Sequence, residues 1–293
     1  MKKILVLGSS GQLGEALKKY LVQWSEVKFL SRNEVDFENV KSSEKIIKNF
    51  KPNFIINAAA YTNVDDAENS QDKAYLINAH AVGKLSELAN SYDVVFIHYS
   101  TDYVFDGKKN APYTETDTPN PLSIYGKSKL EGELLIKKNC SKFFIIRTSG
   151  VISNNNDNFL SKIKILSKSK KDLSVIDDQI TSLNYSEFIS KGTSKMLEKL
   201  ENNLENEKRW GTYHMSGKKL GSWFDFACYA QKKIKIFDPT SALASSMISP
   251  IKSKDFNQKA RRPHYSFLSS NKLEKEFDIK LPNWEKSISQ VIK

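Results

Sequence analysis

A tyrosine and a lysine, Tyr125 and Lys129, stand four residues apart just after a proline-bearing turn. Positions i and i+4 lie on one face of a helix. An ammonium beside a phenol stabilises the phenolate, so the pKa of the phenol falls from about 10 toward the range in which a general acid works. The pair therefore predicts a proton donor, Tyr125, assisted by Lys129. Ordinary amphipathic helices contain the same spacing, so this interpretation needs a cofactor site elsewhere in the chain.

A glycine-rich turn near the N-terminus predicts such a site. Residues 3–7 form a short apolar run, which is followed by Gly8-Ser-Ser-Gly11-Gln-Leu-Gly14 and then by a helical pattern over residues 15–22. Glycines in a strand-to-helix turn permit unusual dihedral angles, a close approach of the backbone to a pyrophosphate, and tight packing of the helix on its strand. The N–H groups at the start of the helix then face the phosphates.

The end of the second predicted strand bears on the choice of dinucleotide. Residues 27–30 lead into Ser31 and Arg32, where an NAD-selective site usually has an acidic residue for the ribose 2′-hydroxyl. The segment has no acid there, and Arg32 could pair with a 2′-phosphate. The pattern favours NADPH. NADH stays open, because a surface arginine without a ligand would give the same sequence.

Small and hydroxyl-bearing residues follow the third and fourth predicted strands, residues 54–57 and 93–98. The third strand ends in Ala58, Ala59 and Ala60, which would let a cofactor lie across its carboxyl end. The fourth delivers Tyr99-Ser100-Thr101-Asp102-Tyr103, at the edge where a parallel sheet presents its ligands.

The order of elements predicts the fold. Helices are expected over residues 41–50 and 71–91 and around Tyr125, and a fifth strand over residues 143–147. Alternating strands and helices predict an α/β fold with a doubly wound parallel sheet of the Rossmann type.

The alternation weakens beyond Ser149, with a helix at 159–169, a short strand at 173–176 and a return to the sheet at 212–216. We expect a dinucleotide-binding domain of residues 1–149 plus about 173–217, and a smaller, mainly helical C-terminal substrate domain of about 150–172 and 218–293.

Composition excludes several classes of protein. No apolar run approaches the roughly 18 residues that span a bilayer, so no membrane segment is expected. Cys140 and Cys228 lie far apart, which argues against a disulfide framework or a zinc site and fits a reducing cytoplasm. The formal net charge of +11 comes from lysines scattered through predicted helices, which argues against nucleic acid and suits a phosphorylated small molecule. The four histidines have no metal-ligand spacing.

Together these motifs resemble the extended short-chain dehydrogenase/reductase superfamily and, within it, the dTDP-4-dehydrorhamnose reductase family. The segments that carry the resemblance are 57–65, 99–105, 112–117 and 125–133, with Arg147-Thr-Ser149 and Gly211-Thr-Tyr-His214 beyond them. The resemblance implies NADPH-dependent reduction of the C4 ketone of a nucleotide-linked 4-keto-6-deoxy sugar. The implied conversion is dTDP-4-dehydro-L-rhamnose to dTDP-L-rhamnose, for a surface polysaccharide.

The resemblance also implies a role for each matching residue. Tyr125 would give its proton to the ketone oxygen, Lys129 would lower the pKa of Tyr125 and hold the nicotinamide ribose, and Thr101 would orient the ketone. The cofactor-binding residues would be Gly8, Ser10, Gly11, Gln12, Leu13, Gly14, Arg32, Asp36, Phe37, Ala58, Ala59, Ala60, Tyr61, Thr62, Tyr99, Tyr125 and Lys129. The substrate-binding residues would be Val64, Asp65, Thr101, Asp102 and Tyr103.

Three departures from the family pattern leave the sugar open. Gly150 stands where the family usually has a tryptophan that contacts the sugar, and segments 180–183 and 264–266 are also altered. One alternative is a reductase of a different nucleotide keto sugar. Another is a non-catalytic NADP-binding subunit that resembles the regulatory subunit of methionine adenosyltransferase. A sugar dehydratase fits less well, because Thr101 is not followed by an Asp-Glu pair. The family likeness leaves a homodimer open, as well as a divalent cation at a dimer contact, with Glu15 as one candidate ligand.

Overall fold

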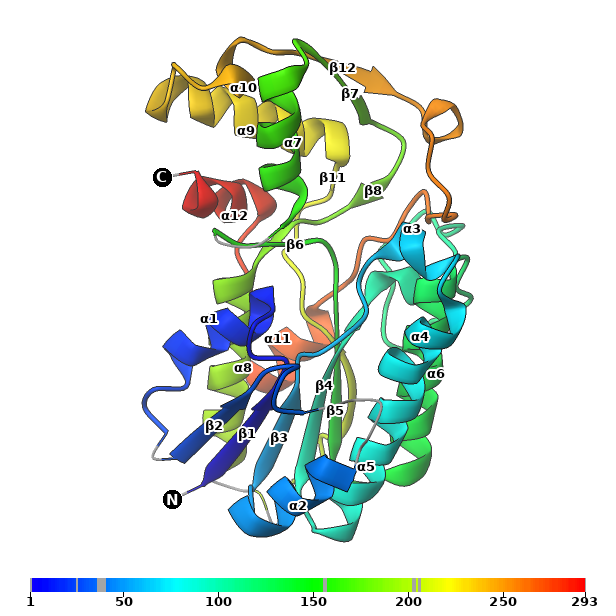
Figure 1. Ribbon diagram of the computed structural model, residues 1–293, viewed down its shortest axis with the longest axis vertical. Helices are drawn as coiled ribbons and strands as arrows, with labels where there is room; N and C mark the ends of the chain where they lie inside the picture. The colour runs from blue at the N-terminus through cyan, green and yellow to red at the C-terminus, as the bar shows by residue number, and fades with distance from the viewer. Residues whose placement is uncertain are drawn as a thin grey trace.

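Six parallel strands form the centre of the molecule. The computed structural model describes residues 2–24, 26–35, 41–154, 157–201, 204 and 207–292. The strands are β1 (Lys3–Leu7), β2 (Glu26–Leu30), β3 (Phe54–Asn57), β4 (Val95–Thr101), β5 (Phe143–Thr148) and β10 (Gly211–His214). Their order is β10-β5-β4-β3-β1-β2, with β2 on one side of β1 and the later strands on the other (Figure 1). The expected doubly wound Rossmann sheet is confirmed.

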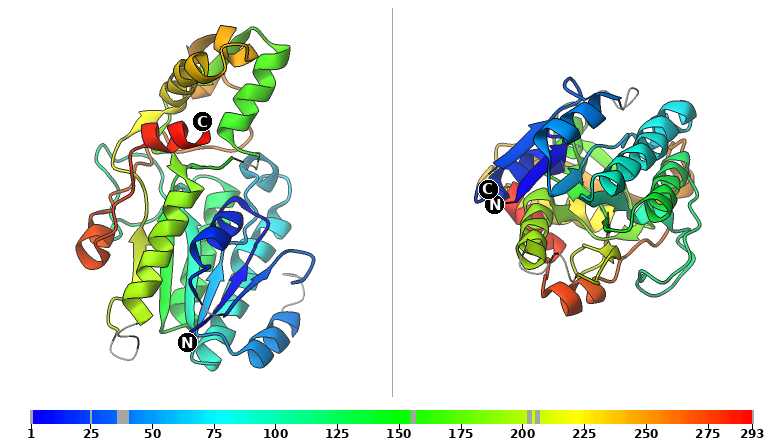
Figure 2. Two further views of the ribbon diagram at one scale, coloured as in Figure 1. Left: turned by 90° about the vertical axis from the view of Figure 1, so that its left-hand side faces the viewer. Right: turned by 90° about the horizontal axis from the view of Figure 1, so that it is seen from below.

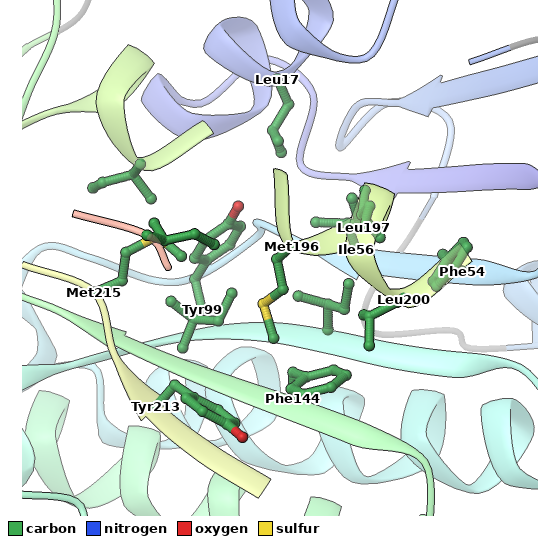
Figure 3. Close-up of a cluster of buried hydrophobic side chains, with 14 of the residues drawn as sticks. Leu17, Phe54, Ile56, Tyr99, Phe144, Met196, Leu197, Leu200, Tyr213 and Met215 are labelled. Carbon is green, nitrogen blue, oxygen red and sulfur yellow. The ribbon is translucent and has the colours of Figure 1, made fainter. Parts of the chain in front are cut away.

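Helices cover both faces of this sheet (Figure 2). Alternate strand residues point to opposite faces, so in β1 Ile4 and Val6 enter one core while Leu5 and Leu7 enter the other. The first core, shown in Figure 3, is closed by α1 (Gln12–Tyr20), α8 (Ser186–Glu201) and α11 (Asn271–Phe277). The second is closed by α2 (Lys41–Phe50), α5 (Ala81–Ser91) and α6 (Ile124–Asn139). Burial on both faces explains why β1 and β3 read as nearly continuous apolar runs.

The segment expected as one helix over residues 71–91 is divided. After the short α3 (Val64–Ala67), it consists of α4 (Gln71–Tyr75), a π-helical turn (Leu76–His80) and α5. The π-helical turn carries Asn78, whose amide accepts a hydrogen bond from the Tyr61 N–H and donates one to the Tyr61 carbonyl. π-Helical turns inside α-helices are frequent at functional sites, and this one fixes the chain that follows β3.

A smaller unit lies beyond the carboxyl ends of the strands (Figure 1). Its helices are α7 (Phe159–Ser169), α9 (Trp223–Phe237), α10 (Ala242–Ser245) and α12 (Trp284–Val291). Its short strand pairs are β6 (Val151–Ile152) with β9 (Asn184–Tyr185), β8 (Ile180–Thr181) with β11 (Gly221–Ser222), and β7 (Asp172–Ile176) with β12 (Met247–Ile251). A separate apolar cluster, which includes Leu160, Phe226 and Trp284, forms its core.

The pairing of β7 corrects one part of the expected domain division. We placed residues 173–176 with the dinucleotide-binding domain, but β7 pairs in parallel with β12 and not with the six-stranded sheet. The two-domain division stays a proposal, in which β7, β8 and β9 go with the smaller unit. Across the described parts of the chain, no helix is both long and apolar enough to cross a membrane.

Candidate active site

A cavity of about 540 Å³ lies between the six-stranded sheet and the smaller unit. From the sheet side it is lined by Gln12, Thr62, Asn63, Val64, Asp65, Ser100, Thr101, Asp102, Tyr103, Tyr125, Thr148 and Ser149. The remaining lining residues are Gly150, Val151, Asp157, Lys162, Gln179, Ile180, Thr181, Trp223, Arg262, Pro263 and Ser266. The cavity is therefore at the edge where a doubly wound sheet binds its ligands.

The glycine turn at the start of α1 is compressed against its neighbours. Gly8 has a φ of +81°, and a Cβ there would lie 2.5 Å from the Ala59 nitrogen. A Cβ on Gly14 would lie 2.2 Å from the Gly8 carbonyl oxygen. Only glycine fits at either position without movement of the backbone.

This turn fits a pyrophosphate. Gly11 is the N-cap of α1 and supplies no capping side chain, so the first N–H groups of the helix are free for an anion. Gln12, the first residue of α1, lines the cavity. Ser10 and Gly11 are exposed, Gln12 and Leu13 are half-buried and Gly14 is buried. The predicted pyrophosphate residues thus lie together at one turn.

The other predicted cofactor residues are only partly brought together. Ala58, Ala59, Ala60 and Tyr61 are half-buried and Thr62 is exposed in the chain after β3, while Arg32 is exposed after β2. Asp36 and Phe37 lie outside the described residues. Tyr99 does not reach the cavity, because its ring lies in the first core (Figure 3). Its hydroxyl shares a 2.7 Å hydrogen bond with that of Thr193.

Thr101 and Tyr125 meet at the floor of the cavity. Ser123 caps α6 by accepting a hydrogen bond from the Gly126 N–H, which places Tyr125 in the first turn of the helix. The Thr101 hydroxyl donates to Asp102 over 3.1 Å and is hydrogen-bonded with the Tyr125 side chain. Burial raises the pKa of Tyr125, and the hydrogen bond with Thr101 acts in the opposite direction. The expected depression of the pKa of Tyr125 by Lys129 is therefore not found.

Lys129 points behind the cavity floor. Its Nζ atom donates to the Tyr99 carbonyl over 2.7 Å and lies 2.9 Å from Nε2 of His98. The side chain is 1% exposed. Burial lowers the pKa of Lys129 to about 7, against the opposing charge of Glu133. The four-residue spacing from Tyr125 correctly predicted that Lys129 lies on the same helix, but it did not reveal that His98 is the partner of Lys129.

Asp102 connects the floor of the cavity with the smaller unit. Its carboxylate accepts hydrogen bonds from Thr181 over 3.1 Å and from Ser266 over 2.5 Å, in addition to the one from Thr101. Burial raises the pKa of Asp102 to about 6, and these hydrogen bonds act to lower it. Thr181 and Ser266 were missed as site residues. Both lie in the segments that depart from the family pattern, which was the available signal.

Asp65 and Arg262 form another contact across the cavity. Asp65 accepts from the Ala260 N–H over 3.0 Å and pairs with Nη2 of Arg262 over 2.7 Å. Nε of Arg262 is buried without a partner, so a donor remains for a bound molecule. Val64 and Tyr103 line the same wall. The predicted substrate residues therefore share one cavity.

The absence of a tryptophan at position 150 does not leave the cavity without an aromatic wall. A Cβ on Gly150 would lie 2.9 Å from Cδ1 of Leu183 and 3.2 Å from Cη2 of Trp223. Trp223, at the start of α9, lines the cavity at this point. An aromatic face thus comes from the smaller unit, and a larger residue at 150 would displace it.

Glu15 pairs with Lys18 over 2.8 Å at the surface of α1. Within the described ranges, no group of three or more His, Cys, Asp or Glu side chains is arranged to hold a metal ion.

The whole chain, residues 1–293, matches the family described as the RmlD substrate binding domain. It is 37% identical to a dTDP-4-dehydrorhamnose reductase of Aggregatibacter actinomycetemcomitans, over 99% of this chain and 98% of that protein. The crystal structure of a dTDP-4-dehydrorhamnose reductase from Clostridium acetobutylicum superposes with a TM-score of 0.87 at 34% identity, covering 99% of this chain and 98% of that one. The Bacillus anthracis enzyme in complex with NADP gives a TM-score of 0.86 at 31% identity, with the same coverage.

Proposed function

The chain belongs to the RmlD substrate binding domain family and to the dTDP-4-dehydrorhamnose reductases, and from this premise we propose that it reduces dTDP-4-dehydro-L-rhamnose to dTDP-L-rhamnose with NADPH. The observation that carries the proposal is the contact between Thr101 and Tyr125 on the cavity floor. Net reduction of a ketone needs one proton on its oxygen, and Tyr125 is a half-buried phenol that faces the cavity and holds such a proton at neutral pH.

NADPH would supply the hydride for the C4 carbon, and its pyrophosphate would be held by Gly11, Gln12 and Leu13. Tyr125 would give its hydroxyl proton to the ketone oxygen. Thr101 would orient both the phenol and the ketone, since its hydroxyl already lies between Tyr125 and Asp102. Lys129 would provide a positive charge behind the phenol when it is protonated.

The opposite wall of the cavity suits a sugar nucleotide. The unpartnered Nε of Arg262 is a charged donor of the kind that binds a diphosphate. Trp223 offers an aromatic face for a sugar ring, and Asp102, held by Thr181 and Ser266, offers a carboxylate for a sugar hydroxyl.

The experiment that tests the function is NADPH oxidation, followed by its absorbance, with dTDP-4-dehydro-L-rhamnose generated in place. Turnover with formation of dTDP-L-rhamnose supports the proposal. Turnover only with another nucleotide-linked 4-keto sugar would change the substrate and keep the reaction. NADPH binding without turnover of any such sugar, together with a stoichiometric partner enzyme, would favour the regulatory alternative, which the named relatives do not support.

Replacing Arg32 with alanine should weaken NADPH and spare NADH. Arg32 lies directly after β2 and is exposed, so its guanidinium is free to pair with a 2′-phosphate. A charge-assisted contact of this kind contributes about 1.5 to 3 kcal/mol, so KM for NADPH should rise roughly tenfold to a hundredfold. Steady-state kinetics with NADH provide the internal control. An equal change in KM for both cofactors would contradict the role of Arg32.

Two further proposals concern the setting of the enzyme. A cytoplasmic location is favoured by two free cysteines, Cys140 and Cys228. A homodimer is proposed from the family resemblance and can be tested by sedimentation.

A further inference from the structure

A buried chain of polar side chains runs behind the cavity floor, from the end of β3 through β4 to α6. Nδ2 of Asn57 lies 3.1 Å from Nδ1 of His98, and Nε2 of His98 lies 2.9 Å from Nζ of Lys129. The three residues are 1%, 0% and 1% exposed. The proposed reaction uses Lys129 and gives no role to the other two.

The orientation of the Asn57 amide is fixed by a backbone group. The Ala59 N–H, which can only donate, gives a 3.1 Å hydrogen bond to Oδ1 of Asn57. The amide nitrogen of Asn57 therefore faces Nδ1 of His98. Because the amide nitrogen donates, Nδ1 of His98 must accept the hydrogen bond. A neutral imidazole that accepts at Nδ1 carries its proton on Nε2.

The proton on Nε2 of His98 determines the state of its neighbour. An ammonium can only donate, so an N–H on Nε2 facing a charged Lys129 would put two donors together. A neutral amine resolves this, because its lone pair accepts from His98 while one of its N–H bonds donates to the Tyr99 carbonyl.

We propose that Asn57 and His98 are positioning residues that hold Lys129 as a neutral amine, and that Lys129 gains a proton only when the side-chain amide of Asn57 flips and exchanges the places of its oxygen and nitrogen. Turning the amide moves the histidine proton to Nδ1 and leaves Nε2 to accept from the ammonium. It also breaks the hydrogen bond between Ala59 and Asn57, so protonation of Lys129 is coupled to the chain after β3.

The charges around Lys129 agree with this assignment. Burial lowers the pKa of Lys129. Burial also holds the pKa of His98 well below its usual range, so the imidazole is neutral. Glu133 on α6 favours the ammonium, but it is already paired with Arg147 of β5 over 2.6 Å and accepts from Ser100 of β4. Tyr125, four residues before Lys129 on α6, is an uncharged phenol near neutral pH.

The direct test is nuclear magnetic resonance of the whole protein, with nitrogen-15 in histidine and carbon-13 at the lysine Cε. We expect the His98 tautomer with a protonated Nε2 and a bare Nδ1, and a Lys129 titration near neutral pH. In Asn57→Asp, one carboxylate oxygen still accepts from the Ala59 N–H while the other accepts from Nδ1. The tautomer should therefore reverse, and the Lys129 titration should move upward by roughly one pH unit or more. A wild-type His98 protonated at Nδ1, or a Lys129 titration unchanged by Asn57→Asp, would overturn the proposal.

A second variant covers the case in which a buried aspartate prevents folding. In His98→Gln the carboxamide oxygen can accept from an ammonium, so the Lys129 titration should again move upward. The same variant also identifies the His98 signals, because they are missing from its spectrum. His214→Gln is the matched control, because His214 is equally buried but bonds to the Tyr113 carbonyl, away from Lys129. An upward movement in His214→Gln as well would show that burial alone, and not the Asn57 chain, sets the titration.

The consequence for catalysis rests on the proposed function, whereas the two spectroscopic measurements do not. If Lys129 acts as an ammonium behind Tyr125, kcat/KM should fall as the pH rises through the Lys129 titration. In Asn57→Asp that fall should occur at higher pH, and in His214→Gln it should not move. A profile that stays fixed while the Lys129 titration moves would remove Lys129 from the proton step and leave the tautomer assignment standing.

Discussion

The Tyr125→Phe variant is expected to lose about 10²- to 10⁴-fold in kcat while it binds NADPH almost as tightly as the unchanged protein. Phenylalanine keeps the ring, which packs edge-on against Tyr103 at 5.8 Å between centroids, and removes only the hydroxyl. The hydroxyl is the group that contacts Thr101 and the proton source for the ketone oxygen. Single-turnover kinetics, together with NADPH binding followed by fluorescence, separate the chemical step from cofactor affinity.

A tyrosine outside the site provides the matched control for this variant. Tyr229 on α9 shares a 3.2 Å hydrogen bond with Ser289 in the smaller unit, so Tyr229→Phe also removes one phenolic hydroxyl. We expect it to keep the full turnover number. If Tyr125→Phe kept the turnover number as well, the proton would have to come from another group, and the assignment of Tyr125 would be wrong.

Local sequence patterns predicted the sheet because they reflect local physics. The glycine turn between β1 and α1 can be recognised in the sequence because Gly14 meets backbone atoms only a few residues away, and Gly8 meets those just after the adjacent strand β3. The short apolar runs of β1 and β3 show because both faces of these strands are covered. The same reasoning placed Thr101 at the carboxyl edge of the sheet, whereas the family resemblance grouped it with Tyr125, and the structure brings the two side chains together.

Features that depend on distant contacts could not be predicted in this way. β7 has the pattern of a strand, but its partner β12 is about 75 residues later, so the sequence alone did not show which sheet it joins. The spacing of Tyr125 and Lys129 gives a shared helix face and says nothing of the histidine that β4 places against the lysine. The burial that raises the pKa of Tyr125, and the hydrogen bond with Thr101 that opposes it, likewise appear only in the folded chain.

The Glu133→Ala variant is expected to lose about 3 to 5 kcal/mol of its free energy of unfolding. Glu133 and Arg147 are fully buried between α6 and β5, with hydrogen bonds of 2.9 and 2.6 Å between guanidinium and carboxylate. Ser100 gives the same carboxylate a third hydrogen bond of 2.6 Å. Removing the carboxylate leaves the Arg147 guanidinium buried without its counter-charge, and urea unfolding measures the cost.

Two comparison variants separate the buried charge from the lost hydrogen bonds. Glu87→Ala removes an exposed carboxylate that pairs with Lys84 over 2.8 Å, and it should cost no more than about 1 kcal/mol. The double change of Glu133→Leu with Arg147→Met replaces both charges by apolar side chains of similar size. Because the penalty of Glu133→Ala comes from an unpaired charge, the double variant should recover most of the lost stability. If it unfolds as readily as Glu133→Ala, the ion pair itself, and not the stranded guanidinium, contributes the stability that holds α6 and its Tyr125 against the sheet.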